Sequence, residues 1–368
     1  MKDDREWLKA IGSEFAVDGR FVSGAPFGSG HINDTSSLVY EHEGKTTRYV
    51  LQRINDNVFK NPRLVMENMS RVCSHQLARL KEQGTDDAGR RCLQLVHSKD
   101  GQPFHVDRKG GYWRVCPLIE RAHTCDKVES EALARTAGQA FGQFQKQVVG
   151  LPGERLHETI PDFHNTEKRY VSLEGAIKAD SCKRVDSCTA EIAFIKERRE
   201  IVSVINDLMA AGEIPDRITH NDTKLNNVMI DDDTGEALCV IDLDTVMPGS
   251  ALFDFGDMVR TATSPALEDE KDLSLVQIQV PLFKGLTEGY LSETGNFLTQ
   301  AEREHLAFSG KLITFEQGIR FLTDYLEGDC YYKTGYGNHN LVRARNQLKL
   351  VESIEENEKE LESIVKNY

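Results

Sequence analysis

The chain has 368 residues, of which 39% are hydrophobic, and it carries a formal net charge of −14. This length favours two lobes or domains over one. The acidic balance argues against nucleic acid and anionic membrane surfaces as partners, and no run of about eighteen apolar residues offers a membrane span. The charged start, which lacks an apolar signal core, and the scattered cysteines, which lack metal-type spacing, predict a cytoplasmic protein with reduced thiols.

The first third of the chain predicts a small β-rich lobe with one helix. Two β-type runs flank a glycine-rich segment at 27–31, and residues 36–54 predict a hairpin with "EHEGKT" as its turn. Apolar residues at helical spacing follow over residues 61–80. Three further runs, at 92–98, 103–107 and 112–120, predict strands. We therefore expect an antiparallel sheet with a helix packed on it.

Long helical patterns dominate after residues 117–123. Apolar stripes at helical spacing run through 131–150, 191–210 and 341–368, and such stripes are typical of a helical core. The change of pattern predicts a short hinge between a β-rich lobe at 1–118 and a larger, mostly helical lobe at 119–368.

The stretch "THNDTKLNNVMI" (219–230) crowds short polar side chains before an apolar run. A second apolar run, "ALCVID", follows the turn-forming "DDDTGE" and ends at Asp242. If the two runs pair as a hairpin with its tip at Thr234 and Gly235, Asn227 faces Asp242 across the ladder. Directly opposed residues have Cβ atoms roughly 5 Å apart, so the two side chains could share one Mg²⁺. Asp222 would lie in the loop that enters the first strand.

This set of residues suits phosphoryl transfer. Such a reaction needs a metal ion to gather phosphate charge and an aspartate to orient and deprotonate the acceptor hydroxyl. Asp222 is predicted to be that base, and Asn227 and Asp242 are predicted to hold the metal ion. His220 is expected to brace the loop by hydrogen bonds. A His-x-Asp triplet alone would be a weak signal, but its spacing to Asn227 and to "IDLD" makes the combination specific.

The segments "THNDTKLNNVMI" and "CVIDLDTVMPGSALFDFGDMVR" resemble the aminoglycoside phosphotransferase and choline kinase family. The resemblance covers about residues 20–350, and it implies a two-lobed α/β (α+β) fold similar to that of protein kinases. Within the family, the likeness is greatest to kinases of N-acetylhexosamines. Asp254 and Asp257 in "DFGD" are expected to be buried braces and helix caps, because the metal-binding aspartate is taken to be Asp242.

The nucleotide is expected to bind the β-rich lobe. "FGSGHINDT" has the position of a phosphate-covering loop, in which glycines let backbone N–H groups approach phosphate oxygens. "YVLQRI" lacks the lysine that protein kinases carry on their third strand, so either Gln52 or Arg53 must serve, and strand alternation points only one of them inward. Charge slightly favours Arg53, while the resemblance could equally favour Gln52. Glu67 on the following helix is a weak candidate for an ion-pair partner. The resemblance also implies that the hinge "CPLI" offers backbone groups to a purine. The predicted nucleotide-binding residues are Gly28, Ser29, Gly30, Gln52, Arg53, Cys116 and Ile119.

The resemblance places the acceptor site in "GIRFLTDYLEGDCYYK" (318–333). Arg320 and Asp324 are four residues apart, so they share one helix face and could hold each other or a polar ligand. Arg320, Asp324 and Tyr331 match positions that contact the sugar in the hexosamine kinases, and His31 could reach the same sugar.

The sequence thus predicts ATP- and Mg²⁺-dependent phosphorylation of N-acetylglucosamine or N-acetylgalactosamine at the anomeric hydroxyl, by a monomer or weak homo-oligomer. Two alternatives stay open at this point. The acceptor could be an aminoglycoside, choline or homoserine, although Arg320 in the pocket disfavours a cation. The chain could also be a catalytically silent kinase-like binding protein, and the missing strand lysine is the feature that favours this reading.

Overall fold

The computed structural model describes residues 2–28 and 32–368. They form two compact units, each built from discontinuous segments. The first unit contains the chain up to His123 together with Gln147–Ile160 and Met229–Met247, and the second contains the remainder. The predicted combination of a β-rich N-terminal region and a helical C-terminal region is confirmed. The predicted boundary between residues 118 and 119 stays a prediction.

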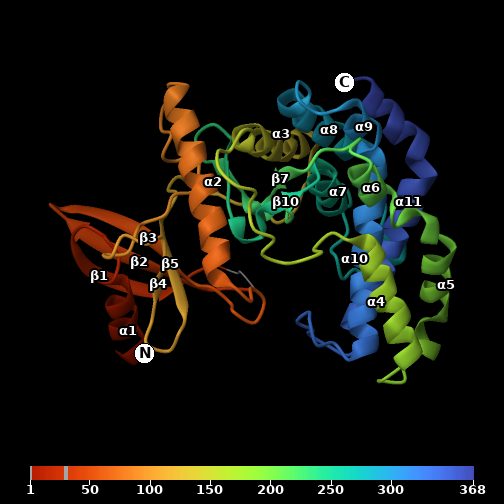
Figure 1. Cartoon of the computed structure of the whole chain (residues 1–368), viewed down its shortest axis with the longest axis horizontal. Helices are drawn as coiled ribbons and strands as arrows, with labels where there is room; N and C mark the ends of the chain where they lie inside the picture. The colour runs from red at the N-terminus through yellow and green to blue at the C-terminus, as the bar shows by residue number, and fades with distance from the viewer. Residues whose placement is uncertain (1, 29–31) are drawn as a thin grey trace. The chain divides into compact units, whose positions relative to one another are not determined.

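The first unit is built on a five-stranded antiparallel sheet in the order β1-β2-β3-β5-β4 (Figure 1). Its strands are β1 (Arg20–Pro26), β2 (Asp34–His42), β3 (Lys45–Arg53), β4 (His105–Val106) and β5 (Tyr112–Pro117). The predicted hairpin is confirmed, because β2 and β3 are joined by Glu43 and Gly44, both with positive φ as a tight hairpin turn requires. The strand predicted at 92–98 is wrong: within it, only the single bridges Val96–Val115 and Ser98–Phe15 form.

Two helices accompany this sheet, α1 (Lys2–Gly12) and α2 (Pro62–Glu82). The sheet core gathers apolar side chains from α1, β2, β3 and β5, namely Leu8, Ile11, Leu38, Leu51, Trp113 and Val115. The predicted helix at 61–80 is confirmed by α2, which starts at Pro62, where the missing proline N–H costs no hydrogen bond. A second, three-stranded sheet joins β6 (Ala122–His123), β8 (Val228–Asp231) and β9 (Ala237–Val240).

The second unit is mostly helical. Its longest helices, α10 (Leu306–Glu327) and α11 (His339–Lys366), lie side by side and are drawn in blue in Figure 1. They bury Phe315, Ile319, Leu322, Leu348 and Val351 against α4 (Thr166–Ala179) and α5 (Thr189–Glu197). The other helices are α3 (Glu131–Val148), α6 (Val204–Ala210), α7 (Ala251–Ala262), α8 (Val280–Thr294) and α9 (Gln300–Glu304).

The helix predicted over 191–210 is broken, because the turn Arg199–Ile201 separates α5 from α6. Two short strands, β7 (Arg217–Thr219) and β10 (Met247–Gly249), pair with each other. Strand β7 leads into the polar loop, and β10 leads into α7. Among the described residues, no helix combines the length and apolar character that crossing a membrane requires.

Candidate active site

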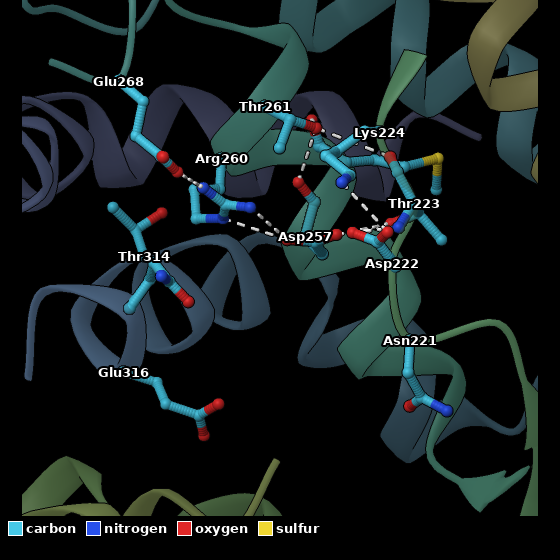
Figure 2. A network of polar contacts seen from close by, with 12 residues as sticks. Asn221, Asp222, Thr223, Lys224, Asp257, Arg260, Thr261, Glu268, Thr314 and Glu316 are labelled. Atoms are coloured by element: carbon cyan, nitrogen blue, oxygen red, sulfur yellow. Dashed lines mark hydrogen bonds and ion pairs between the residues drawn. The ribbon is translucent and has the colours of Figure 1, made fainter. Parts of the chain in front are cut away.

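The loop after β7 carries Asp222, and its backbone is fixed in an unusual conformation. Asn221 has φ +64°, in the left-handed region that asparagine tolerates better than most residues. The carboxylate of Asp222 pairs with the Lys224 ammonium at 3.0 Å, and its side chain keeps 24% of its surface exposed. Asn227 donates its amide N–H to the Asp222 carbonyl at 2.8 Å and to the carboxylate at 3.2 Å. Figure 2 shows Lys224 beside Asp222. Asp222 is therefore oriented by its own loop, while part of its side chain stays accessible to solvent.

Two aspartates of α7 hold this loop from beneath. Asp254 is fully buried and accepts the backbone N–H groups of His220 at 2.9 Å and Asn221 at 2.7 Å. Asp257 accepts the N–H of Thr223 at 2.8 Å. The expectation that both aspartates are buried braces is confirmed. They are not helix caps, however, because Ser250 caps the N-terminus of α7.

The charges of these two braces are balanced differently. Burial raises the pKa of Asp254, although the nearby His220 and the two backbone donors act in the opposite direction. Burial would also raise the pKa of Asp257, but the Arg260 guanidinium at 2.9 Å, together with His164 and Lys224, lowers that pKa. Figure 2 shows Arg260 between Asp257 and Glu268.

His220 braces the loop, as predicted. Its ring is buried edge-on to Phe141 and Phe144, with centroids 5.5 and 5.6 Å away. Its Nδ1 accepts the backbone N–H of Asp222 at 3.3 Å. The residue thereby fixes the start of the loop. Its ring is buried, whereas the Asp222 side chain keeps part of its surface accessible.

A second buried pair reaches the same loop from α10. His164 lies 2.9 Å from a Glu316 oxygen through Nδ1, and its Nε2 lies 3.3 Å from the Asn221 carbonyl. The other Glu316 oxygen accepts the Thr166 hydroxyl at 2.6 Å. Burial would raise the pKa of Glu316, but His164, Arg320 and the Thr166 hydroxyl together lower it below its ordinary value. Sequence patterns gave no sign of this pair, because its members are 152 residues apart.

The predicted metal ligands both lie just outside the strands. Asn227 belongs to the turn Leu225–Asn227, and Asp242 follows β9 with φ +60° before the turn Leu243–Thr245. The ladder opposition that placed Asn227 across from Asp242 is therefore wrong, although β8 and β9 are neighbours joined by a tight turn at Gly235. Their shared metal site stays a prediction. Each still suits Mg²⁺: the amide nitrogen of Asn227 is occupied by Asp222, which turns its oxygen away, and Asp242 is a carboxylate.

No group of three or more His, Cys, Asp and Glu side chains able to hold a metal ion occurs in residues 2–28 and 32–368. Mg²⁺ often uses only one or two carboxylates, with substrate phosphates and water completing its shell.

Gln52 and Arg53 leave β3 on opposite faces, as strand alternation predicts. Gln52 accepts a hydrogen bond from Arg114 Nε at 2.9 Å and donates one to the Thr35 hydroxyl at 3.1 Å. Arg53 lies instead near the exposed carboxylates of Asp34 and Asp56, at 3.7 and 4.0 Å. The side chain that faces the buried polar groups is thus Gln52, although charge had favoured Arg53.

Arg114 and Asp244 form a buried ion pair that the sequence reading missed. Arg114 lies on β5 directly opposite Gln52, and its fork contacts both oxygens of Asp244, with Nη2 at 3.0 Å. Burial alone would lower the pKa of Arg114, but the charge of Asp244 keeps it raised. Asn33 also donates to Asp244, at 2.6 Å. An arginine inside the apolar run "YWRVC" was the available signal, since a buried charge needs a partner.

Of the other residues predicted to bind the nucleotide, Gly28, Cys116 and Ile119 lie among the described residues. Gly28 has φ +78°, a conformation that favours glycine, while Ser29, Gly30 and His31 lie outside the described residues. Cys116 lies on β5 opposite Val50, and burial raises the pKa of its thiol to about 11. Ile119 follows that strand and is half-buried.

Glu67, the weak candidate for a strand partner, instead lies 3.2 Å from His157. Its neighbour Asn68 is buried and donates to the carbonyl oxygens of His157 at 2.8 Å and Val246 at 3.0 Å. Helix α2 is thus tied to the segment after "IDLD" by the Asn68 amide.

Arg320 and Asp324 do not hold each other. Arg320 lies over the rings of Phe163 and Tyr332 and donates to Gln317 at 3.2 Å. Burial would lower the pKa of Arg320, but Tyr332 and then Glu316 raise it.

The Asp324 carboxylate is occupied by the loop that follows α10. It accepts backbone N–H groups from Cys330, Tyr331 and Tyr332 and the side-chain amide of Asn340, at 2.7 to 3.0 Å. Four donors fill the lone-pair sites of a carboxylate, so Asp324 acts on the loop and has little capacity left for a ligand. Tyr331 is 61% exposed, with its ring edge-on to Tyr332.

Comparison with known proteins places this geometry in context. The sequence model of the phosphotransferase enzyme family (APH) matches residues 23–273. An aminoglycoside phosphotransferase from Alicyclobacillus acidocaldarius superposes with a TM-score of 0.60 at 12% identity, over 98% of this chain and 96% of that one. A choline kinase from Cryptosporidium parvum gives 0.58 at 13% identity, over 99% of both chains. A spectinomycin phosphotransferase in complex with ADP and spectinomycin gives 0.55 at 12% identity, over 95% of this chain and 98% of that one. At these identities the likeness concerns the fold.

Proposed function

Because the chain belongs to the phosphotransferase enzyme family, we propose that it transfers the γ-phosphoryl group of ATP to the anomeric hydroxyl of N-acetylglucosamine or N-acetylgalactosamine. The product is the hexosamine 1-phosphate. Phosphoryl transfer to a small molecule follows from the family, and the ADP bound to the spectinomycin phosphotransferase supports a nucleotide donor. The acceptor, Mg²⁺ and a cytoplasmic location belong to the proposal.

The assignment of Asp222 as the catalytic base is supported by its position. Asp222 is a solvent-accessible carboxylate on a loop whose flanking N–H groups are bound by buried aspartates. Such fixed orientation is what a reaction needs when catalysis consists mainly of positioning. Asp222 accepts the proton of the attacking hydroxyl, and Asn227 fixes the direction of its carboxylate. The predicted base is thus rigid on its protein side and open on the other.

The metal would be held by Asn227 and Asp242. When bound, Mg²⁺ supplies positive charge to the phosphate oxygens of ATP. Without this charge, ATP binding should weaken strongly, because a chain with a net charge of −14 repels a nucleotide.

Positive charge near the proposed acceptor site favours a neutral sugar. Burial and the charge of Arg320 both lower the pKa of Arg169, so the two guanidinium groups are close enough to repel each other. Within the described part of the chain, the buried Nε of Arg169 has no hydrogen-bond partner. These arginines disfavour choline or an aminoglycoside and offer planar donors to sugar oxygens, while Tyr331 offers an exposed aromatic face.

Turnover of ATP and Mg²⁺ with a panel of acceptors tests the proposal. The panel contains N-acetylglucosamine, N-acetylgalactosamine, choline, homoserine and an aminoglycoside, and phosphorus NMR identifies the product by its coupling to the anomeric proton. We expect a sugar 1-phosphate from the N-acetylhexosamines alone. Efficient turnover of a cationic acceptor would overturn the acceptor assignment, and ATP binding without turnover of any acceptor would favour the silent binding protein.

The substitution Asp222→Asn separates binding from chemistry. We expect ATP affinity, measured by calorimetry, to stay near that of the wild type, while turnover falls by a factor of about a thousand. Wild-type turnover in this variant would refute the assignment of Asp222 as the base.

A further inference from the structure

A polar cluster in the first unit joins four residues from different segments of the chain. It contains Asn33 after the glycine-rich segment, Gln52 on β3, Arg114 on β5 and Asp244 two residues after Asp242. Arg114 and Asp244 are at most 3% exposed in their side chains, so the pair is shielded from solvent. The cluster has no part in the proton transfer assigned to Asp222.

Arg114 is the centre of this cluster. It donates through Nε to Gln52, through its fork to both oxygens of Asp244, and through Nη1 to the Met69 sulfur on α2 at 3.3 Å. One guanidinium therefore joins β3, β5, α2 and the "IDLD" segment. Bidentate arginine–carboxylate pairing fixes orientation as well as distance, and a lysine ammonium cannot reproduce it.

Asn33 extends the cluster to the end of the glycine-rich segment. It donates to Asp244 at 2.6 Å, and its own oxygen accepts the backbone N–H of Asn55 at 3.0 Å. Asn55 in turn donates its amide to the Ile32 carbonyl at 3.0 Å. The backbone at residues 32–33 is thus fixed relative to Asp244 by hydrogen bonds on both sides.

We propose that Arg114 and Asn33 are positioning residues for the nucleotide, acting through Asp244 to hold the backbone at residues 32–33 and the Asp242 segment in one frame. This inference rests on the proposed use of ATP. The frame takes over the organising task that a strand lysine and a helix glutamate share in protein kinases, where both must be in place for activity. Here β3 offers Gln52, and its amide is already engaged by Arg114 and Thr35.

Electrostatics supports the same assignment. The pKa of Arg114 is lowered by burial and raised by Asp244, by Cys116 and, to a smaller extent, by the charge of Asp242. Arg114 is therefore within electrostatic reach of the carboxylate proposed to hold the metal. A change at Arg114 or Asn33 should alter how ATP is bound and leave the acceptor side unaffected.

The test uses variants of different severity in the full-length protein. Asn33 is half-buried, so Asn33→Ala removes its hydrogen bonds with Asp244 and with the Asn55 N–H without opening the core. Asn33→Asp places a carboxylate against Asp244, and Arg114→Lys keeps the charge but removes the fork. The matched control is Arg20→Gln, which removes an exposed arginine–glutamate ion pair of 3.0 Å from the same sheet.

We expect Asn33→Ala to raise the KM for ATP at least about tenfold, because it removes a hydrogen bond to a charged group as well as the one that holds Asn55, with the acceptor KM unchanged. Asn33→Asp should raise it further, and Arg114→Lys should raise it while reducing the additional effect of Asn33→Ala in the double variant. Arg20→Gln should match the wild type.

The inference is overturned if both Asn33 variants bind ATP as the wild type does, or if they lower only the melting temperature while the surviving enzyme keeps its kinetic constants. If the wild type itself neither binds nor turns over ATP, the proposed function fails first, and calorimetry of the wild type with ATP and Mg²⁺ detects that case separately.

Discussion

The Asp254 carboxylate accepts the backbone N–H of Asn221 at 2.7 Å, and this contact connects helix α7 to the residue before the proposed base. Asn221 needs such support because its left-handed φ of +64° is an uncommon conformation. The geometry of the active loop is therefore determined from inside the helical unit.

The substitution Asp254→Asn should weaken the hydrogen bonds that hold the backbone of His220 and Asn221. The new amide nitrogen would face backbone N–H donors, so unfolding free energy should fall by about 1–3 kcal/mol. The turnover number should fall by about a hundredfold because the base is misplaced, while ATP affinity changes little. Thermal unfolding and steady-state kinetics measure the two effects, and an unchanged turnover number in a destabilised variant would contradict the positioning role.

The pair of His164 and Glu316 predicts a pH-dependent contribution to stability. The pKa of Glu316 is lowered in the folded protein, so the contribution is fully present above the unfolded-state value of about 4.3 and is lost as pH falls toward the folded value. Glu316→Gln should therefore destabilise the protein most at neutral pH. The difference in melting temperature from the wild type should shrink below about pH 4.3. A constant difference from pH 7 downward would rule this out.

The Asp324 carboxylate predicts an effect on the acceptor alone. In Asp324→Asn, an amide nitrogen replaces one acceptor oxygen and opposes the donors of residues 330–332 or Asn340. The loop carrying Tyr331 should loosen and the acceptor KM should rise about tenfold, with the ATP KM within about twofold of the wild type. Equal changes in both constants would indicate a general structural defect.

Close helix packing predicts opposite effects for two glycine-to-alanine changes. A Cβ at Gly256 on α7 would collide with the Ser309 carbonyl oxygen and lie 2.7 Å from Ile313 Cγ1 on α10. Gly256→Ala should destabilise the protein by about 1–3 kcal/mol.

Gly175 on α4 is exposed, with no atom within 4 Å of an added Cβ, so Gly175→Ala should stabilise the protein by about 0.5–1 kcal/mol. Chemical denaturation compares both, and a stable Gly256→Ala variant would refute the close contact.

The sequence predicts those features that depend on local pattern. Alternation and turn chemistry located the hairpin at Glu43 and Gly44, and the crowding of polar residues marked the loop that carries Asp222, the proposed base. The bracing role of Asp254 was predicted because Asp242 was taken as the metal-binding aspartate, and the buried carboxylate indeed accepts backbone donors.

Features that depend on distant pairing were not predictable from pattern. Arg114 and Asp244 are 130 residues apart, and one sequence gives no register between such segments. Helical spacing predicted that Arg320 and Asp324 share a face, but it could not weigh that pairing against the loop donors that occupy Asp324. The side of β3 that faces inward likewise depended on the partner strand, which supplies Arg114 to Gln52.

The Arg114–Asp244 pair also makes the N-terminal sheet depend on a later part of the chain. Arg114 belongs to the N-terminal sheet, and its counter-ion Asp244 follows 130 residues later in the chain. A buried charge without a partner is strongly unfavourable. A fragment ending at His123 lacks this counter-ion, so we expect its sheet to be less stable than the same sheet in the full chain.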